Sequence, residues 1–390
     1  MRLVDVAERR ARLGIRHQLV ESAPDIVTAT NAVVALHSSD PATVYLSLQA
    51  RVSEFSVDDL ERALYEDKTL LRLYGMRRTL WVADRMSLPM IDHSSTNRLG
   101  KIERPRTIRI LEEGKVTEDG SAFLDAMTPM VLASLDTHGE RLTRDLTSDI
   151  PALRQRIEFY NKAGKLSATT GAGSRVMNQL SLESKIVRTR PAGSWVSGQY
   201  AWATMEQWLG GPIPSMPVEE ASTQLVTAYI GAFGPVTEND LRWWTGWPLR
   251  QLRPAIGASG AVEVEVEGGT ALVLRQDVEP VASSDPWVAV LPSLDSTTMG
   301  WKDRDWYMGE HTPVLFDRNG NAGPTLWVDG QVVGGWAVRN DGTVAYELLE
   351  DVGPEMTTRL EERLDRVERW LDGTVFTPRF RSLHDRRLGG

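Results

Sequence analysis

The sequence predicts an α+β fold of three tandem winged-helix units, each a helix-turn-helix with a β-hairpin, with additional β-hairpins at the C-terminal end. Three observations predict it. A helix-start pattern recurs three times, helical and strand-like segments flank each copy, and 390 residues with 41% hydrophobic content exceed one ordinary domain. We place the units at residues 1–115, 116–215 and 216–390, the last including the hairpins and a final helix.

The repeated pattern is a Ser or Thr followed by acidic residues and an Asp-Leu pair. Its three copies begin at Ser56, Thr143 and Thr237, which are 87 and 94 residues apart. A hydroxyl at this place accepts hydrogen bonds from the free backbone N–H groups of a helix start, and the acids suit the positive helix end. The pattern therefore predicts three N-caps, spaced by about the length of a small domain.

Periodicity places further elements around these caps. Apolar residues recur at helical spacing over 123–135 and 221–233, and alternating segments over 70–82, 185–200 and 262–274 predict hairpins. Helix, turn, capped helix, helix and hairpin is the order of a winged helix. A winged helix can also bind proteins, but three in tandem favour a curved cradle for nucleic acid.

The last part of the chain follows a different pattern. Residues 288–292 predict a buried strand, and residues 314–316 and 324–328 predict a hairpin around an Asn-Gly turn. Asp329-Gly330 opens another hairpin into residues 332–338. A charged helix is expected over 350–370, on the surface.

Composition excludes several classes of protein. The chain has no cysteine, so disulfides and thiolate metal sites are excluded, and its six histidines lack ligand spacing, so we expect no metal. No apolar run reaches the roughly 18 residues of a membrane span, and we expect a cytoplasmic, nucleoid-associated protein. The net charge is −9, yet basic residues cluster at positions 9–17, 98–109 and 379–387, either as solvated surface or as a DNA-binding face.

Two local features have alternative interpretations. Trp243, Trp244 and Trp247 could stack on bases, but their helical spacing favours a place in the core. The segment Gly171–Ser174 lacks the full phosphate-loop pattern, and we expect no strand before it. We interpret it as the start of a recognition helix over 174–182, whose free N–H groups could meet a DNA phosphate.

Four segments together resemble one family. They are Met76–Val82, which reads Met-Arg-Arg-Thr-Leu-Trp-Val, and the segments 232–246, 291–304 and 320–334. In this order they are similar to the winged-helix DNA glycosylases of the AlkZ and YcaQ type. The resemblance implies a C-shaped stack of three winged helices that holds duplex DNA in its concave face. It also implies cleavage of the N-glycosidic bond of alkylated purines, including bulky N7-alkylguanines.

The chemistry of that reaction explains the family's active motif. N7-alkylation puts positive charge on the purine, so the enzyme must mainly stabilise an oxocarbenium-like sugar and place a water. Family members do this with Gln-x-Gln or Gln-x-Asp just before Asp-Pro. Here the segment 36–41 reads Leu-His-Ser-Ser-Asp-Pro, so the matching positions are His37 and Ser39.

The candidate catalytic residues are therefore His37, Ser39 and the nearest carboxylate, Asp40. A His and a Ser would form a variant pair, in which His37 holds a water or acts as a general base and Ser39 offers a shorter, weaker acceptor. Asp40 ahead of Pro41 is equally explained as a helix cap. One hypothesis is a monofunctional DNA glycosylase of base excision repair or genotoxin resistance. The other is a catalytically inactive winged-helix protein that recognises damage or regulates transcription.

Candidate DNA contacts come from the same segments. They are Arg51, Arg77, Arg78, Arg304, Arg318, Asn319 and Asn321, of which Arg78 stands where the family has glycine and the last three lie near a hairpin tip. Asp295 and Trp81 are expected to support the pocket. The expected partner is duplex DNA with an alkylated base, bound by a monomer, and no cofactor is expected because hydrolysis needs only water.

Overall fold

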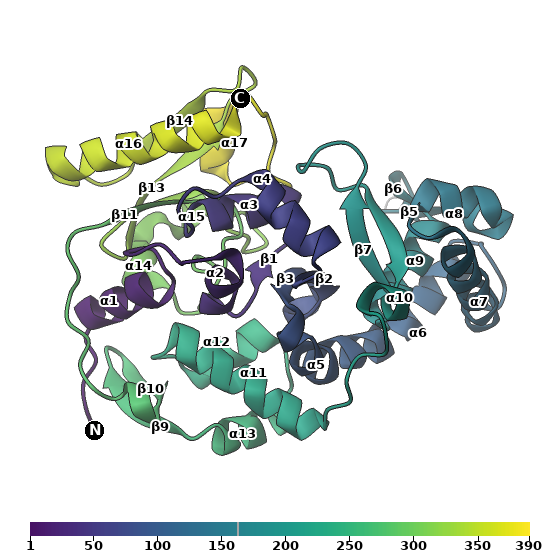
Figure 1. The fold of residues 1–390 in the computed structure, drawn as a ribbon, viewed down its shortest axis with the longest axis horizontal. Coiled ribbons are helices and arrows are strands. Elements are labelled where there is room, and N and C mark those ends of the chain that lie inside the picture. The colour runs from purple at the N-terminus through teal and green to yellow at the C-terminus, as the bar shows by residue number, and fades with distance from the viewer. Residues whose placement is uncertain (162–163) are drawn as a thin grey trace.

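The same order of elements occurs three times along the chain (Figure 1). A computed structural model describes residues 1–161 and 164–390 as a mixed helical and stranded protein, which confirms the α+β class. In each unit a helix is followed by a short strand or bridge, two more helices and a hairpin. The short strand always pairs with the second strand of the hairpin, which is the hydrogen-bonding pattern of a winged helix.

The first unit carries the motif segment on its short strand. Its elements are α2 (Ile26–Ala32), β1 (Leu36–His37), α3 (Pro41–Gln49), α4 (Val57–Glu61), β2 (Leu70–Tyr74) and β3 (Leu80–Asp84). β1 pairs with β3, so Leu36 lies opposite Val82 and His37 opposite Trp81. α5 (Leu88–Ile91) and the long α6 (Asn97–Glu113) lead to the second unit.

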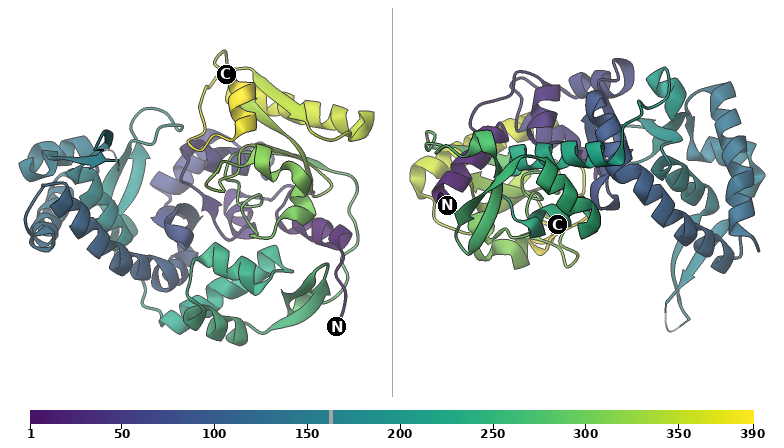
Figure 2. Two further views of the ribbon diagram at one scale, coloured as in Figure 1. Left: turned by 180° about the vertical axis from the view of Figure 1, so that it is seen from behind. Right: turned by 90° about the horizontal axis from the view of Figure 1, so that it is seen from below.

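The second unit contains one more hairpin than expected. Its elements are α7 (Gly120–His138), β4 (Arg141–Leu142), α8 (Thr143–Asp149), α9 (Ala172–Leu182), β7 (Ile186–Pro191), β8 (Tyr200–Thr204) and α10 (Met205–Leu209). Between α8 and α9, β5 (Arg156–Tyr160) and β6 (Leu166–Gly171) form a hairpin that projects from the unit (Figure 2). β6 is largely exposed and lacks the alternation of apolar and polar residues from which a half-buried strand is predicted, and β5 alternates over only five residues. β6 ends at Gly171, so a strand does precede the segment 171–174, which corrects the expectation that none does.

The third unit consists of α11 (Val218–Phe233), α12 (Glu238–Thr245), α13 (Leu249–Ala258), β9 (Ala261–Val266) and β10 (Gly269–Leu274). Val236 takes the place of the short strand and bridges to Leu272 on β10. Trp244 and Trp247 are buried in the core, which confirms their predicted place there.

The structure corrects the alignment of the three predicted caps. Thr237 caps α12, the second helix of its unit, whereas Ser56 caps α4, the third helix. In the first unit the equivalent of Thr237 is Asp40, which caps α3. Thr143 is the first residue of α8 and not its cap, and its hydroxyl accepts from the Trp202 indole N–H at 2.8 Å. The cap pattern failed here because it marks any helix start, whichever helix of the unit follows.

A four-stranded sheet follows the third unit. Its strand order is β11 (Val288–Leu291), β12 (Thr325–Val328), β13 (Gln331–Val338) and β14 (Val344–Leu348). α16 (Gly353–Leu371) packs against it through its leucine face and α17 (Leu383–Gly389) packs on β13. The prediction of a strand at 314–316 is wrong. The structure has two short helices in this region, α14 (Asp305–Met308) and α15 (Thr312–Leu315). The turn that follows is held by Asp317, which accepts from the main chain of Asn319 and Asn321.

Hydrophobic contacts divide the molecule into unequal parts. Buried residues between Leu111 and Trp202 form a cluster of their own, and the second unit stands to one side in Figure 1. The first and third units share one larger cluster, which also takes in residues of the final sheet. The boundaries at residues 115 and 215 remain predictions. None of the described helices combines the length and the apolar surface that crossing a bilayer requires.

The N-terminal helix α1 (Val6–Arg16) packs on α11 of the third unit. Its basic residues are turned inward, since Arg9, Arg12 and the following His17 are at most 8% exposed. Arg12 pairs with Glu8, and its Nη2 also donates to the Glu279 carbonyl at 2.7 Å. Arg9, Arg12 and His17 of the predicted basic face are therefore internal structure, whereas Arg10 and Arg16 are partly exposed.

Candidate active site

The motif segment turns sharply between β1 and α3. Asp40 caps α3 by accepting from the main-chain N–H of Ala42 at 3.2 Å, and its second oxygen accepts from that of Arg379 at 2.8 Å. Burial raises the pKa of Asp40, and the side chain is 4% exposed. Both oxygens thus accept a main-chain hydrogen bond, which confirms the capping interpretation. A catalytic role for Asp40 remains a prediction.

His37 is the part of the motif segment that points into the protein, and its side chain is buried. Its ring meets that of Trp81 edge-to-face at 4.9 Å between centroids, and Nδ1 accepts from the main-chain N–H of Ser39 at 3.4 Å. Burial, together with the nearby charge of Arg77, lowers the pKa of His37 to about 3. The imidazole is therefore neutral near pH 7 and does not reach the cleft that Ser39 lines.

The expected His37–Ser39 pair is thus corrected by the geometry. Positions two apart on a strand share a face, but β1 ends at His37 and the chain bends before α3. Ser39 therefore faces outward, where its Oγ lies 3.4 Å from the main-chain N–H of Leu80. His37 acts on the segment from behind, through the main chain of Ser39.

Acid sensitivity should report the burial of His37. Because its folded-state pKa lies below the ordinary 6.5, the unfolded state binds the proton first, and stability present above about pH 6.5 is lost as pH falls toward 3. Urea unfolding of a His37→Gln variant should therefore lose less stability between about pH 7 and pH 5 than the wild type does. Equal losses in both proteins would contradict a buried, neutral His37. His17, whose pKa burial likewise lowers to about 3, remains in both proteins as an internal reference.

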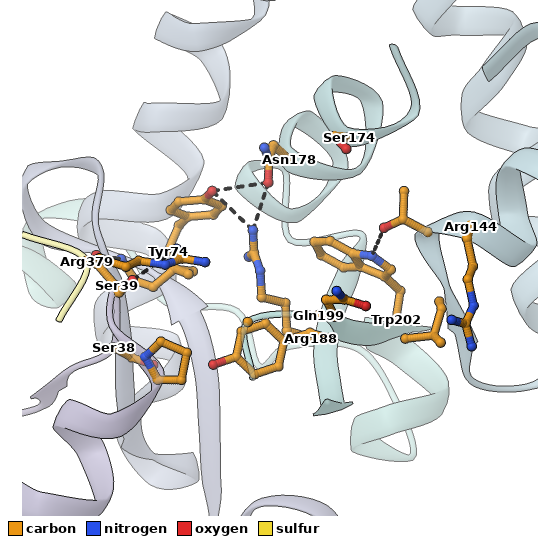
Figure 3. Close-up of a pocket in the computed structure, with 16 residues that line it drawn as sticks. Ser38, Ser39, Tyr74, Arg144, Ser174, Asn178, Arg188, Gln199, Trp202 and Arg379 are labelled. Carbon is orange, nitrogen blue, oxygen red and sulfur yellow. Dashed lines mark hydrogen bonds between the residues drawn. The ribbon is translucent and has the colours of Figure 1, made fainter. Parts of the chain in front are cut away.

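An open cleft of about 520 Å³ separates the first and second units (Figure 3). The first unit contributes Ser38, Ser39, Pro41, Tyr74 and Leu80, and the C-terminal segment contributes Arg379. The wall across the cleft belongs to the second unit and consists of Leu142, Thr143, Arg144, Ser174, Asn178, Arg188, Gly198, Gln199, Tyr200 and Trp202.

Arginines organise both walls of the cleft. Arg188 on β7 donates to Asn178 Oδ1 at 2.8 Å and to the Tyr74 hydroxyl at 3.2 Å, which joins the two units. Its guanidinium lies over the rings of Tyr74 and Trp202, 4.8 and 4.5 Å from their centroids. Beneath the first wall, Arg72 on β2 donates to Ser38 Oγ at 2.8 Å. The buried cation Arg72 therefore fixes the motif segment through the side chain of Ser38.

Arg51 was expected to contact DNA, and this prediction is wrong. Its side chain is fully buried and forms an ion pair with Asp295 at 2.7 Å. Asp295 and Trp81 are the two residues predicted to support the pocket, and neither lines the cleft. The Trp81 indole N–H donates to the Met76 carbonyl at 3.1 Å, and a supporting role for both residues remains a prediction. A single sequence cannot distinguish an arginine that pairs internally from one that faces solvent.

The arginines after β2 sit on a strained turn. Arg77 and Arg78 have φ angles of 55° and 61°, the left-handed region that favours glycine, where each side chain costs about 1 kcal/mol. Arg77 stacks over Trp243 at 4.1 Å, and burial lowers its pKa to about 10. Arg78 is half exposed and pairs with Glu103 at 2.7 Å. As DNA contacts both remain predictions.

The other predicted DNA contacts gather at a second groove, of about 890 Å³. Arg304 stacks on Phe316 at 4.4 Å, while Arg318 and Asn319 are exposed at the turn before β12. Asn321 does not line this groove, because its amide donates to Asp317 at 2.9 Å. Arg379 borders this groove as well as the cleft, so the two hollows adjoin one another. Contact of these side chains with DNA remains a prediction.

Comparison with known proteins identifies the family. A sequence model described as "DNA glycosylase AlkZ-like" matches residues 30–370. The chain belongs to this family. The DNA glycosylase AlkZ of Streptomyces sahachiroi has a similar fold, with a TM-score of 0.71 over 94% of this chain and 97% of that structure at 19% identity.

A curated AlkZ-like relative adds a function for comparison. The "Interstrand DNA cross-link repair glycosylase" of Streptomyces sahachiroi is 32% identical over 131 residues, which is 31% of this chain. The aligned part spans about a third of that relative, 35% of its length. The family match includes the motif segment and both walls of the cleft, but it ends before Arg379.

Several residues of the cleft have no signal in the sequence. Tyr74, Asn178 and Arg188 carry no motif, and tertiary packing alone brings them together. Arg379 belongs to the basic cluster at 379–387 that the sequence does display, but nothing in the sequence places this cluster beside Ser39. Among the described residues no group of three or more His, Asp and Glu side chains is arranged to hold a metal.

Proposed function

We propose that this chain is a monofunctional DNA glycosylase that acts as a monomer on duplex DNA and hydrolyses the N-glycosidic bond of alkylated purines. Bulky N7-alkylguanines are the proposed substrate class. The observation that carries the proposal is the position of Ser39, which occupies the place of the family's motif and lines a cleft bordered by arginines of two units. The Streptomyces sahachiroi relative, named as an interstrand DNA cross-link repair glycosylase, supports a glycosylase that acts on damaged DNA.

The reaction can proceed without a strong base. The C1′–N9 bond breaks first, and its electron pair passes to the purine ring, where it neutralises the charge created by N7-alkylation. The oxocarbenium-like sugar is then captured by water, which forms the O–C1′ bond and releases a proton to solvent. Cleavage precedes attack, so the residue beside the sugar has mainly to position water, and a serine hydroxyl can both donate and accept for this purpose.

Ser39 is the proposed catalytic residue and His37 its positioning residue. The Nδ1 atom of His37 accepts the main-chain N–H of Ser39, which fixes the bend that turns the hydroxyl toward the cleft. Because the neutral imidazole does not meet the cleft, it takes no proton from the water. Asp40 contributes by starting α3 at Pro41.

Base excision by a Ser39→Ala variant tests this assignment. A duplex with a single N7-methylguanine or a bulky N7 adduct is incubated with enzyme in excess, and abasic sites are converted to strand breaks with alkali. We expect single-turnover cleavage to fall about 10-fold, as a hydrogen bond to the attacking water is lost. The exposed Ser53 of the same unit provides a matched control, and Ser53→Ala should cleave at the wild-type rate.

One observation favours a second function, that of a catalytically inactive DNA-binding protein. Among the described residues that line the cleft there is no Asp or Glu, and the motif position holds a serine. Such a protein would recognise damage or regulate transcription without cleaving. Wild-type protein that binds both modified duplexes yet yields no abasic sites would establish this function and exclude the glycosylase.

A further inference from the structure

The cleft beside Ser39 is strongly cationic in a chain of net charge −9. Arg144, Arg188 and Arg379 border it from three different segments, and no described acidic side chain lines it. Arg144 is exposed, with its nearest carboxylate, Asp145, at 3.7 Å. A concave site with one sign of charge concentrates ligands of the opposite sign. The geometry therefore indicates an anion.

Arg188 provides independent evidence because its charge is buried without a counter-ion. The side chain is 8% exposed, and its partners are the neutral oxygens of Ser181, Tyr74 and Asn178. No carboxylate of the described residues forms an ion pair with it. Burial lowers the pKa of Arg188, and the buried charge of Arg72 lowers it further. The rings of Tyr74 and Trp202 and these neutral oxygens offset part of the cost of burying this cation, but they supply no negative charge. An anionic ligand would supply that charge.

Arg379 approaches the cleft from the C-terminal segment and is fixed at both ends. Its main-chain N–H donates to Asp40, and its Nη1 donates to the Ser39 carbonyl at 3.1 Å. Its Nη2 packs against Gly198 of the second unit so closely that a Cβ there would lie 2.5 Å away. Figure 3 shows Arg379 beside Ser39 on the near wall and Arg188 on the wall across from it.

We propose that Arg188 and Arg379 together bind one phosphodiester of the DNA backbone next to the lesion. Two planar guanidinium groups suit the oxygens of a phosphate, whereas they repel a cationic N7-alkylpurine. The site therefore holds the backbone and not the damaged base, and it sets the sugar of the lesion nucleotide beside Ser39. The inference rests on the proposed recognition of duplex DNA but is independent of bond cleavage.

Binding to an inert lesion analogue tests the site apart from catalysis. Full-length protein is titrated with duplexes that carry a tetrahydrofuran abasic analogue, in which each phosphate around the analogue is replaced in turn by an uncharged methylphosphonate. The wild type should lose affinity about 10-fold at one phosphate position. In Arg379→Ala the loss of affinity at that position should be clearly smaller, since one of the two guanidinium groups that bind the phosphate is gone and only Arg188 remains.

The choice of variants keeps the test interpretable. Arg379→Ala leaves in place the main-chain N–H that donates to the Asp40 carboxylate, so the motif segment keeps that contact. Arg366→Ala removes the same charge from the exposed face of α16, away from the cleft, and should show the wild-type methylphosphonate pattern. The slope of log affinity against log salt should fall by about 0.9 in Arg379→Ala, the amount expected for one phosphate contact.

The outcomes separate the alternatives. The proposal is overturned if the methylphosphonate pattern is the same in the wild type and Arg379→Ala, or if Arg379→Ala binds no more weakly than Arg366→Ala. Inorganic phosphate is titrated in parallel, and a thermal shift that depends on Arg379 without any methylphosphonate effect would assign the site to a small free anion instead. A protein that passes the binding test but never forms abasic sites would retain this phosphate site and lose only the proposed glycosylase activity.

Discussion

Replacing Asp295 with alanine is expected to lower the free energy of unfolding by about 3–5 kcal/mol. Asp295 accepts two hydrogen bonds from Arg51, at 2.7 and 2.9 Å, and a third from the Ser47 hydroxyl at 2.6 Å. Both side chains of the pair are fully buried. Burial alone would raise the pKa of Asp295, but Arg51 and these hydrogen bonds hold it below its ordinary value. The variant would leave the Arg51 charge buried without a carboxylate.

Urea unfolding followed by circular dichroism measures this effect. The exposed Asp285 gives a matched control, and Asp285→Ala should change the free energy of unfolding by less than about 0.5 kcal/mol. A double variant with Asp295→Leu and Arg51→Met should recover much of the loss, because it removes both charges and fills their volume. A loss below about 1 kcal/mol in Asp295→Ala would contradict a structural role for the pair.

Replacing Ser39 with glutamine is expected to accelerate base excision by about 10- to 100-fold. The substitution restores at this position the amide that the family motif carries, and its oxygen reaches farther and accepts more strongly than a serine hydroxyl. The cleft of about 520 Å³ leaves room for the longer side chain. Aspartate is expected to help less, because Arg379, whose Nη1 already donates to the Ser39 carbonyl, would pair with it.

Single-turnover cleavage of a duplex with one N7-methylguanine measures the acceleration. Ser53→Gln, on an exposed part of the same unit, serves as the control and should leave the rate unchanged. The binding affinity for the tetrahydrofuran duplex should change little in Ser39→Gln, which separates a gain in chemistry from a gain in binding. An unchanged rate with intact folding would show that Ser39 does not face the reacting sugar.

Much of the fold followed from local patterns. Periodicity predicts the helix at 221–233 and the hairpin at 262–274, and the segment 171–174 predicts a helix start before 174–182. The structure places α11, the β9–β10 pair and α9 there. The patterns failed where context changes the meaning of a local signal. Residues 314–316 look like a strand, but α15 extends to Leu315, and the exposed strand β6 shows no alternation that would predict its hairpin with β5.

The sequence by itself determined the three-unit organisation, the family resemblance and the position of the segment 36–41, where His and Ser replace the residues of the family motif. Each of these depends on residues close together in the chain. Only the tertiary structure decided what each charged or polar side chain does. It separated Ser39 from His37 by ending β1, buried Arg51 against Asp295, and brought Arg188 and Arg379 to one cleft. The physical reason is that exposure and pairing depend on contacts between segments up to several hundred residues apart, which local propensity does not encode.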